Sequence, residues 1–229
     1  MKKLLSSVLQ LFYPHQCPGC GNDYLQLNHF LCSRCIHRLP ETGYFEKADN
    51  PVEKAFYGRI RLEQAAALYY FTKNSLVQEL MVQLKYKGNR DAGLFLGRMI
   101  GHNIRTSERF ADIDILVPLP LNPKKQFKRG YNQAELICVG IAEVCELPLF
   151  TDAVVRKQFT ESQTKQNRMA RWLNMEGVFE IRNPEQLINK HVLLVDDVIT
   201  TGATLEACGS YILAVPGTRL SIATAAYTI

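Results

Sequence analysis

The apolar positions of the chain alternate between short continuous runs and longer stretches with helical spacing. Continuous runs such as 65–71 (AAALYYF) and 192–195 (VLLV) predict strands buried on both faces. Strands are expected at residues 65–71, 113–117, 149–155, 178–181, 192–196 and 220–226. Helices are expected at residues 76–87, 92–105, 131–145 and 204–214. This alternation predicts an α/β fold with a mostly parallel sheet, in which ligands bind beyond the carboxyl ends of the strands.

The first 50 residues differ in character from the rest of the chain. Residues 4–12 fit a short amphipathic helix, and residues 17–35 contain four of the seven cysteines. A polar stretch then continues to about residue 50. We therefore expect a small N-terminal segment over residues 1–50 and one α/β domain over residues 51–229.

The N-terminus imitates a secretory signal, because Lys2 and Lys3 precede an apolar run. Ser6, Ser7 and Gln10 interrupt that run, however, and no A-x-A cleavage site follows it. The sequence also lacks the 18 consecutive apolar residues of a membrane span. We expect a cytoplasmic protein, in which closely spaced cysteines indicate metal binding before disulfides.

The segment 191–204 (HVLLVDDVITTGAT) is the strongest candidate for binding chemistry. Its apolar strand ends at Asp196 and Asp197, and small and hydroxyl residues then open a helix. Backbone N–H groups at a helix start lack partners within the helix, so they can hold a phosphate dianion. The predicted phosphate loop consists of Thr200, Thr201, Gly202, Ala203 and Thr204.

The two aspartates can accept hydrogen bonds from vicinal ribose hydroxyls, and their charge can attract a hydrated Mg²⁺. An acidic helix cap is the alternative explanation, but it accounts for one aspartate and not for the second or for the threonines.

The chain contains neither G-x-x-x-x-G-K-[ST] nor G-x-G-x-x-G. The sequence therefore argues against a P-loop ATPase and against a dinucleotide-binding domain.

The N-terminal cysteines form two C-x-x-C pairs that are separated by eleven residues. Each pair supplies two thiolates, and two pairs complete a tetrahedral structural zinc site without an open position. The expected ligands are Cys17, Cys20, Cys32 and Cys35. A histidine could replace one of them, and the candidates are His15, His29 and His37.

The order of strand, paired acids and Thr/Gly loop resembles the signature of the type I phosphoribosyltransferases, which bind phosphoribosyl pyrophosphate (PRPP). The resemblance implies that the loop binds the 5-phosphate, that Asp196 and Asp197 bind the ribose, and that Mg²⁺ accompanies PRPP. It also implies that the loop after Val117 holds the pyrophosphate. The candidate cations there are Lys124, Lys125, Lys128 and Arg129. Any single lysine here could instead belong to a solvated surface loop. Arg129 is the stronger candidate, because it opens the motif RGYNQ at residues 129–133.

Residues 156–177 are polar and carry five cations against two acids. The type I enzymes have a mobile hood over the pyrophosphate at this place in the chain, so a lid is implied here, with Gln163 and Arg168 as its ligand contacts. A surface hairpin explains each of these residues equally well. Lys165 stands where many nucleotide-making members have a glycine after SQT, so the lid geometry departs from theirs at this position.

Taken with the block at 117–136 and the double C-x-x-C, the chain resembles the ComF/GntX family of competence-associated phosphoribosyltransferase-like proteins. The segment 84–88 (LKYKG) also matches, and the resemblance suggests that Lys85 reaches the site; a lysine at a surface helix end is the equal alternative. The family implies a type I phosphoribosyltransferase-like fold with helices on both faces of the sheet and an N-terminal zinc finger with four cysteine ligands. It also implies a link to DNA uptake, without a settled reaction.

Two functions stay open. The first is a PRPP- or ribose-5-phosphate-binding phosphoribosyltransferase in DNA uptake or nucleotide metabolism, whose acceptor and catalytic residues the sequence does not identify. The second is a non-catalytic accessory protein that senses phosphate, binds single-stranded DNA or contacts a DNA-uptake helicase; a homodimer is compatible with both. The net charge of +5 suits phosphate ligands but not a dedicated DNA-binding protein. Stacking on DNA requires aromatic residues, and the cluster near the zinc segment is Tyr13, Tyr24, Phe30, Tyr44 and Phe45. We expect most of these residues to pack the zinc finger instead.

Overall fold

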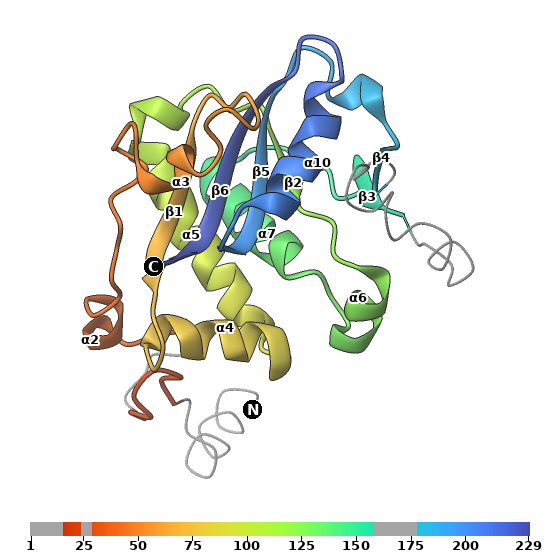
Figure 1. Ribbon diagram of the computed structural model, residues 1–229. Coiled ribbons are helices and arrows are strands. Elements are labelled where there is room, and N and C mark those ends of the chain that lie inside the picture. Colours follow the sequence, from red (N-terminus) through yellow and green to blue (C-terminus); the bar gives the residue numbers. More distant parts are fainter. Residues whose placement is uncertain (1–15, 24–28, 158–177) are drawn as a thin grey trace.

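A four-stranded parallel sheet forms the centre of the protein (Figure 1). The computed structural model describes residues 16–23, 29–157 and 178–229. The sheet has the strand order β1–β6–β5–β2, and each neighbouring pair is parallel. The strands are β1 (Ala65–Phe71), β2 (Ile115–Pro118), β5 (His191–Ile199) and β6 (Arg219–Thr228). The predicted parallel sheet is therefore confirmed.

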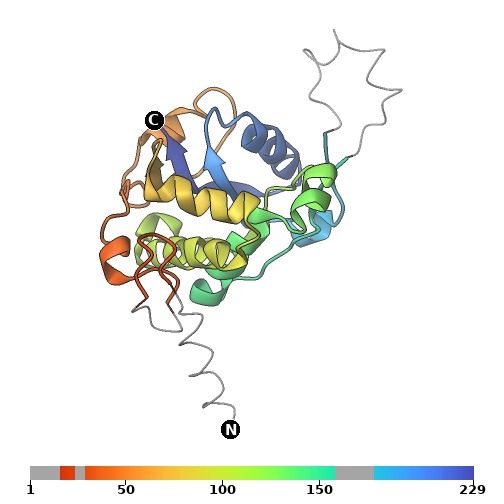
Figure 2. The same cartoon turned by 90° about the horizontal axis from the view of Figure 1, so that it is seen from below.

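Helices cover both faces of this sheet (Figures 1 and 2). Helices α5 (Arg90–Thr106) and α7 (Gln133–Cys145) pack together on one face, and α10 (Ala203–Leu213) lies on the other. A Cβ atom on Gly97 or Gly140 would overlap the backbone of the facing helix, so the crossing of α5 and α7 requires glycine at both positions. Helix α4 (Leu76–Tyr86) follows β1 and lies beyond the carboxyl ends of the strands (Figure 1).

Several short elements complete the described structure. They are α2 (Ser33–Ile36), α3 (Pro51–Lys54), α6 (Pro123–Arg129), β3 (Val154–Arg156), β4 (Phe179–Ile181) and two 3₁₀ turns, Glu108–Phe110 and Pro184–Gln186. Strands β3 and β4 form a separate antiparallel pair, and Phe179 contacts Tyr211 of α10 with ring centroids 6.3 Å apart. The predicted lid between these strands, with Gln163 and Arg168, lies outside the described residues.

The sequence pattern is wrong about some element boundaries. Strand β5 continues through both aspartates to Ile199, because Asp196, Val198 and Ile199 remain paired with β6. The pattern leaves residues 123–129 as a loop, whereas they form α6. The Asn122 side chain caps this helix, Pro123 occupies its first turn and Gly130 ends it at φ +78°. Only an isolated bridge to Leu116 forms at Leu149, before β3 begins at Val154.

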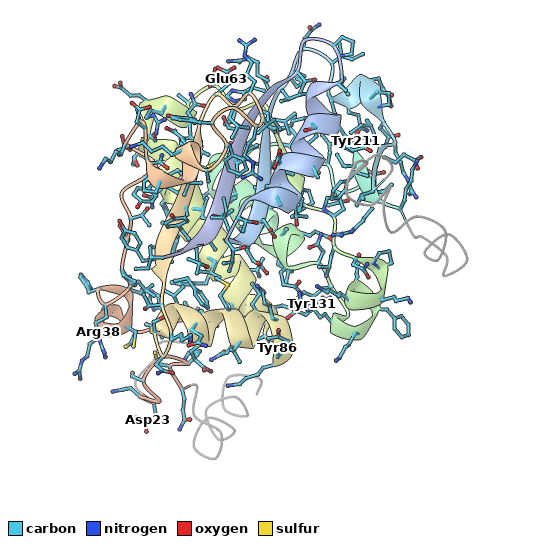
Figure 3. The ribbon with its side chains drawn as sticks, in the orientation of Figure 1. Asp23, Arg38, Glu63, Tyr86, Tyr131 and Tyr211 are labelled. Atoms are coloured by element: carbon cyan, nitrogen blue, oxygen red, sulfur yellow. The ribbon has the colours of Figure 1, made fainter. Side chains whose placement is uncertain are left out.

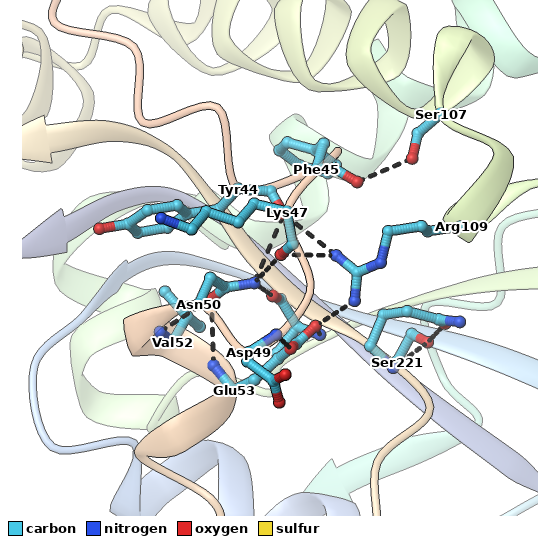
Figure 4. Close-up of polar contacts among 12 residues, drawn as sticks. Tyr44, Phe45, Lys47, Asp49, Asn50, Val52, Glu53, Ser107, Arg109 and Ser221 are labelled. Carbon is cyan, nitrogen blue, oxygen red and sulfur yellow. Dashed lines mark hydrogen bonds and ion pairs between the residues drawn. The ribbon is translucent and has the colours of Figure 1, made fainter.

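The polar stretch before residue 50 is tied to the core by backbone and side-chain hydrogen bonds (Figure 4). The Asn50 side chain is buried and donates to the carbonyl of Ala65 at 2.8 Å. Arg109 donates to the carbonyl of Lys47 at 2.9 Å and pairs with Glu53. The Ser107 hydroxyl donates to the carbonyl of Phe45 at 2.8 Å. Residues 44–53 therefore pack against β1, and the domain boundary near residue 50 stays a prediction.

A buried polar network joins the amino ends of β5 and β6. His191 is fully buried, with Nδ1 3.0 Å from Asp112 and Nε2 2.8 Å from the Ser221 hydroxyl. These are the residue types of a Ser–His–Asp triad, but Ser221 is also fully buried and its hydroxyl donates to Gln64 at 2.8 Å. The network therefore stabilises the sheet. Burial lowers the pKa of His191, so the ring is neutral in the folded protein near pH 7.

This neutral histidine predicts a loss of stability in mild acid. In the unfolded chain the pKa of His191 is about 6.5, and below that pH the unfolded chain takes up a proton that the buried ring binds less well. The free energy of unfolding therefore decreases as the pH is lowered. His191→Gln keeps a polar group without titrating and should lose less stability between about pH 7 and pH 5. Each unit of lowered pKa corresponds to about 1.4 kcal/mol. Urea unfolding at several pH values measures the free energy of unfolding of both proteins. An equal change of this free energy with pH in the two proteins would contradict the prediction.

Candidate functional site

The loop between β5 and α10 presents backbone amides without acceptors. Gly202 caps α10 with φ +73°, and no side chain caps the helix. Within the described residues, the amides of Thr201, Gly202, Thr204 and Leu205 have no hydrogen-bond partner, and the Ala203 amide has only a 3.4 Å contact with the Thr201 hydroxyl. The side chains of Thr200, Thr201 and Thr204 are exposed. A helix start of this kind can hold an anion.

Two residues far back in the sequence support this loop. The ring of Phe56 lies so close to Gly202 that a Cβ there would be 2.8 Å from it. Arg59 donates to the Thr201 carbonyl at 2.9 Å and pairs with Glu206 in the first turn of α10. Sequence reasoning missed both Phe56 and Arg59. No local signal marks them, because they contact the loop only through the folded chain.

Asp196 and Asp197 adjoin the loop at the carboxyl edge of the sheet. The Nζ atom of Lys85, near the end of α4, lies 2.9 Å from an oxygen of Asp197, and these side chains are 22% and 12% exposed. Burial, and next the charge of Asp197, raise the pKa of Asp196 to about 8, although the Asp197 amide and Lys85 oppose the shift. Burial thus favours the protonated form of Asp196. A protonated carboxyl can donate a hydrogen bond as well as accept one, which suits a pair of hydroxyl groups.

The predicted pyrophosphate cations lie on α6, beside the end of α4. The side chains of Lys124 and Lys125 are exposed, and neither contacts the acid pair within the described residues. Arg129 donates to Gln133 at 2.5 Å and lies 5.7 Å from the ring centroid of Tyr86. Figure 3 shows Tyr86 where α4 ends, beside α6. The structure thus brings Lys85 to the acids and leaves the α6 cations at a neighbouring surface.

Among the described residues, the aromatic side chains near the zinc segment are not the most exposed ones. Tyr44 and Phe45 are buried, and Phe30 packs on Phe95 with centroids 5.3 Å apart. Tyr13 and Tyr24 lie outside the described residues. The apolar environment of β1 and α5 accounts for this burial. The burial of Tyr44 and Phe45 agrees with the expectation that most of this cluster packs, and it leaves no stacking surface at these two residues. Phe127 on α6 and Tyr86 are instead 92% and 75% exposed.

A cavity of about 470 Å³ lies between the start of α6 and the β3–β4 pair. Its wall includes apolar residues from 120–123 and carries cations and acids in equal number: Arg156, Lys157, Arg182, Glu135, Asp152 and Glu180. Neither Asp196 nor the phosphate loop lines it. The balance of charge on the wall gives no preference for an anion.

The four N-terminal cysteines converge as their spacing predicts. Their Sγ atoms all lie within 4.8 Å of one another, so the cluster could bind a metal ion such as zinc. Burial raises the pKa of Cys17, but backbone N–H groups, first that of Cys32, outweigh it and lower the value to about 7. A Cβ on Gly19 would lie 2.8 Å from Leu76, so the cluster packs on the start of α4.

The histidine alternatives do not complete this cluster. His37 is exposed and one of its ring nitrogens lies 2.8 Å from the carbonyl of Ser33. His29 does not belong to the group of converging ligands, and His15 lies outside the described residues.

Among the helices that the structure describes, none has the length and apolarity to cross a membrane.

Comparisons with known proteins agree with this architecture. The profile of the phosphoribosyl transferase domain matches residues 132–228. DNA utilization protein YhgH of Escherichia coli K12 is 24% identical over 200 residues, covering 86% of this chain and 77% of that protein. Competence protein F of Haemophilus influenzae is 25% identical over 192 residues, covering 82% and 76%. Competence protein ComFC of Bacillus subtilis is 27% identical over 205 residues, covering 87% and 72%.

Among solved structures, the chain is similar to the glutamine PRPP amidotransferase from B. subtilis, with a TM-score of 0.44 and 15% identity. That alignment covers 59% of this chain and only 26% of the other, so it carries no argument about function. The matched domain, the parallel sheet with its helices and the relatives aligned over most of the chain lead to one assignment. Over most of its length the chain is similar to the ComF family of phosphoribosyltransferase-like proteins.

Proposed function

We propose that the chain binds a phosphoribosyl ligand such as PRPP at the carboxyl edge of its sheet. The observation that carries the proposal is the adjacency of unpartnered amides at the start of α10 and the acid pair near the carboxyl end of β5. The amides from Thr201 to Leu205 would bind the 5-phosphate, together with the threonine hydroxyls. Asp196 and Asp197 would bind the ribose hydroxyls. A phosphorylated ribose presents this combination of one dianion and two neighbouring hydroxyls.

The charges around the acid pair suit an anionic ligand. Lys85 balances Asp197, and burial favours the neutral form of Asp196, so the two acids repel a phosphate less than two free carboxylates would. Lys124, Lys125 and Arg129 on α6, with Gln163 and Arg168 beyond the described residues, are proposed to face the pyrophosphate. Mg²⁺ would enter with PRPP and neutralise its pyrophosphate. Oxygen donors are available at Asp196 and Asp197, although Lys85 already engages Asp197.

The proposed process is DNA uptake or nucleotide metabolism. Relatives from three genera carry names of DNA utilization or competence. If PRPP reacts here, an acceptor attacks C1 of the ribose, the C1–O bond breaks and pyrophosphate leaves with the bonding electrons. The chain would contribute orientation and cations for the leaving group. Contact with a helicase partner and a homodimer also remain proposals.

Ligand-induced thermal stabilisation tests the binding proposal. With PRPP and Mg²⁺ at about 100 times Kd, the wild-type protein should gain about 2.7 kcal/mol. For a domain of this size that corresponds to an increase in Tm of about 5–10 °C. The double variant Asp196→Asn, Asp197→Asn should lose most of this gain, because the ribose contacts are weakened. Asp91→Asn is the matched control, since Asp91 is exposed on α5 and has no partner within the described residues. A wild-type protein that gains nothing would overturn the proposal.

We also propose that the cysteine cluster holds a structural Zn²⁺. Four thiols within 4.8 Å of one another leave no position for a substrate, and the lowered pKa of Cys17 favours the thiolate that a metal needs. Few apolar residues belong to this segment, so metal coordination would supply much of its folding energy.

Zinc content measured by mass spectrometry tests this second site. The wild-type protein should carry about one Zn²⁺ per chain, and Cys32→Ser should lose most of it. Cys145→Ser is the control, because Cys145 lies on α7 and donates to the carbonyl of Gly101 at 3.2 Å. Retention of full zinc content in Cys32→Ser would contradict the ligand assignment.

Single-stranded DNA binding is a second candidate function that one observation favours. Phe127 and Tyr86 are exposed, Arg129 lies over Tyr86, and α6, which carries Phe127, also carries three lysines. Exposed rings with neighbouring cations offer bases a stacking surface and phosphates a counter-charge. We therefore propose the α6 surface, rather than the zinc segment, as the place where DNA would bind.

Oligonucleotide binding measured by fluorescence anisotropy at fixed salt separates the two functions. Phe127→Ala should weaken binding of oligothymidylate about tenfold, since one base–ring stack contributes about 1–3 kcal/mol. Tyr57→Ala is the control, because Tyr57 is 56% exposed but donates to Asp49, away from α6. The acid-pair double variant should bind DNA like the wild type. Equal affinities of the Phe127 and Tyr57 variants would exclude the α6 surface.

A further inference from the structure

Arg59 contacts the phosphate loop from a segment that lies before the sheet. One nitrogen of its guanidinium group donates to the Thr201 carbonyl at 2.9 Å and to the Ala55 carbonyl at 2.8 Å. The other terminal nitrogen pairs with the carboxylate of Glu206. Arg59 thus links the turn after α3, the phosphate loop and the first turn of α10.

The bond to Thr201 fixes the direction of a peptide plane. In a trans peptide the carbonyl and the next N–H point in opposite directions, so the Thr201 carbonyl and the Gly202 amide face opposite ways. Because the carbonyl is held toward Arg59, the Gly202 amide is directed away from Arg59, and it has no partner within the described residues. A flipped peptide would instead present a carbonyl oxygen, which repels an anion.

Neighbouring residues hold Arg59 and the loop in this arrangement. Glycine tolerates both signs of φ, so the peptide before Gly202 is a point where the loop could rotate. The ring of Phe56 packs against Gly202 and limits that rotation. Glu206 neutralises Arg59 and holds its guanidinium against the loop rather than leaving it free to bind the ligand itself.

We propose that Arg59 is a positioning residue that directs the Gly202 amide toward the 5-phosphate. The inference rests on the proposed function and deepens it, since it adds the segment 56–59 to the proposed site. This segment lies outside residues 132–228, which match the phosphoribosyl transferase domain. The ligand class that depends on Arg59 is a phosphate monoester on a sugar. Arg59 acts through the Thr201–Gly202 peptide.

Calorimetric titration with ribose 5-phosphate tests the inference. Arg59→Gln should raise Kd about tenfold, because a hydrogen bond from a charged group is lost and the peptide is released. Arg59→Lys should recover part of the affinity, since an ammonium group can still donate to the Thr201 carbonyl. Arg61→Gln is the control for charge and should bind like the wild type. Arg61 is exposed and has no ion pair or hydrogen bond within the described residues.

Amide NMR of the same proteins separates positioning from a general effect on folding. Ribose 5-phosphate should shift the Gly202 and Thr204 amide signals of the wild type, whereas in Arg59→Gln the Gly202 signal should shift far less than that of Thr204. If Arg59→Gln does not fold, Glu206→Gln serves instead, with a smaller increase in Kd expected.

The outcomes distinguish the two proposals. A wild-type protein that fails to bind ribose 5-phosphate would overturn the proposed function. Wild-type binding with an unchanged Kd in Arg59→Gln, or with an undiminished Gly202 shift, would overturn the inference alone. A tenfold loss that Arg61→Gln reproduces would also overturn it, because net charge would then be the cause.

Discussion

The start of α10 is the feature on which the rest of the site depends. A helix that follows a buried strand leaves its first amides without acceptors, and within the described residues the only side-chain contact to these amides is the 3.4 Å contact of the Ala203 amide with the Thr201 hydroxyl. Such amides cost little where water reaches them, and Thr201, Ala203 and Thr204 of this loop are exposed. The parallel sheet then fixes the acid pair beside them, since β5 continues as a paired strand to Ile199.

Electrostatics explains how two adjacent acids can stand at the proposed anion site. Two ionised carboxylates would repel a phosphate and each other. Here Lys85 compensates one of them, and burial shifts the other toward its neutral form, with a pKa of about 8. The cost of burying these groups is therefore reduced before any ligand arrives. In the proposed site, the same arrangement would favour hydroxyl groups over a bare divalent cation.

Local sequence patterns predicted the parts of the site that are contiguous in the chain. The order of strand, acids and Thr/Gly loop is readable in 191–204 because each chemical role follows from neighbouring residues. The convergence of the cysteines is likewise encoded in their spacing, and it is confirmed. By contrast, Phe56 and Arg59 reach the loop across about 140 residues of sequence, and only the packing of the turn after α3 brings them there. Helix α6 was missed because its capping residues also fit a turn.

Helix α4 connects the two chemically distinct parts of the chain. Its first residue, Leu76, contacts the cysteine cluster at Gly19, and Lys85, near its other end, pairs with Asp197. Between them Val77, Leu80 and Leu84 are fully buried, so the helix is held firmly against the core. Tyr131 adds a further constraint, because its hydroxyl donates to the Leu84 carbonyl at 2.5 Å. The position of Lys85 is thus set by packing along the whole helix, and the charge balance at the acid pair follows from that packing.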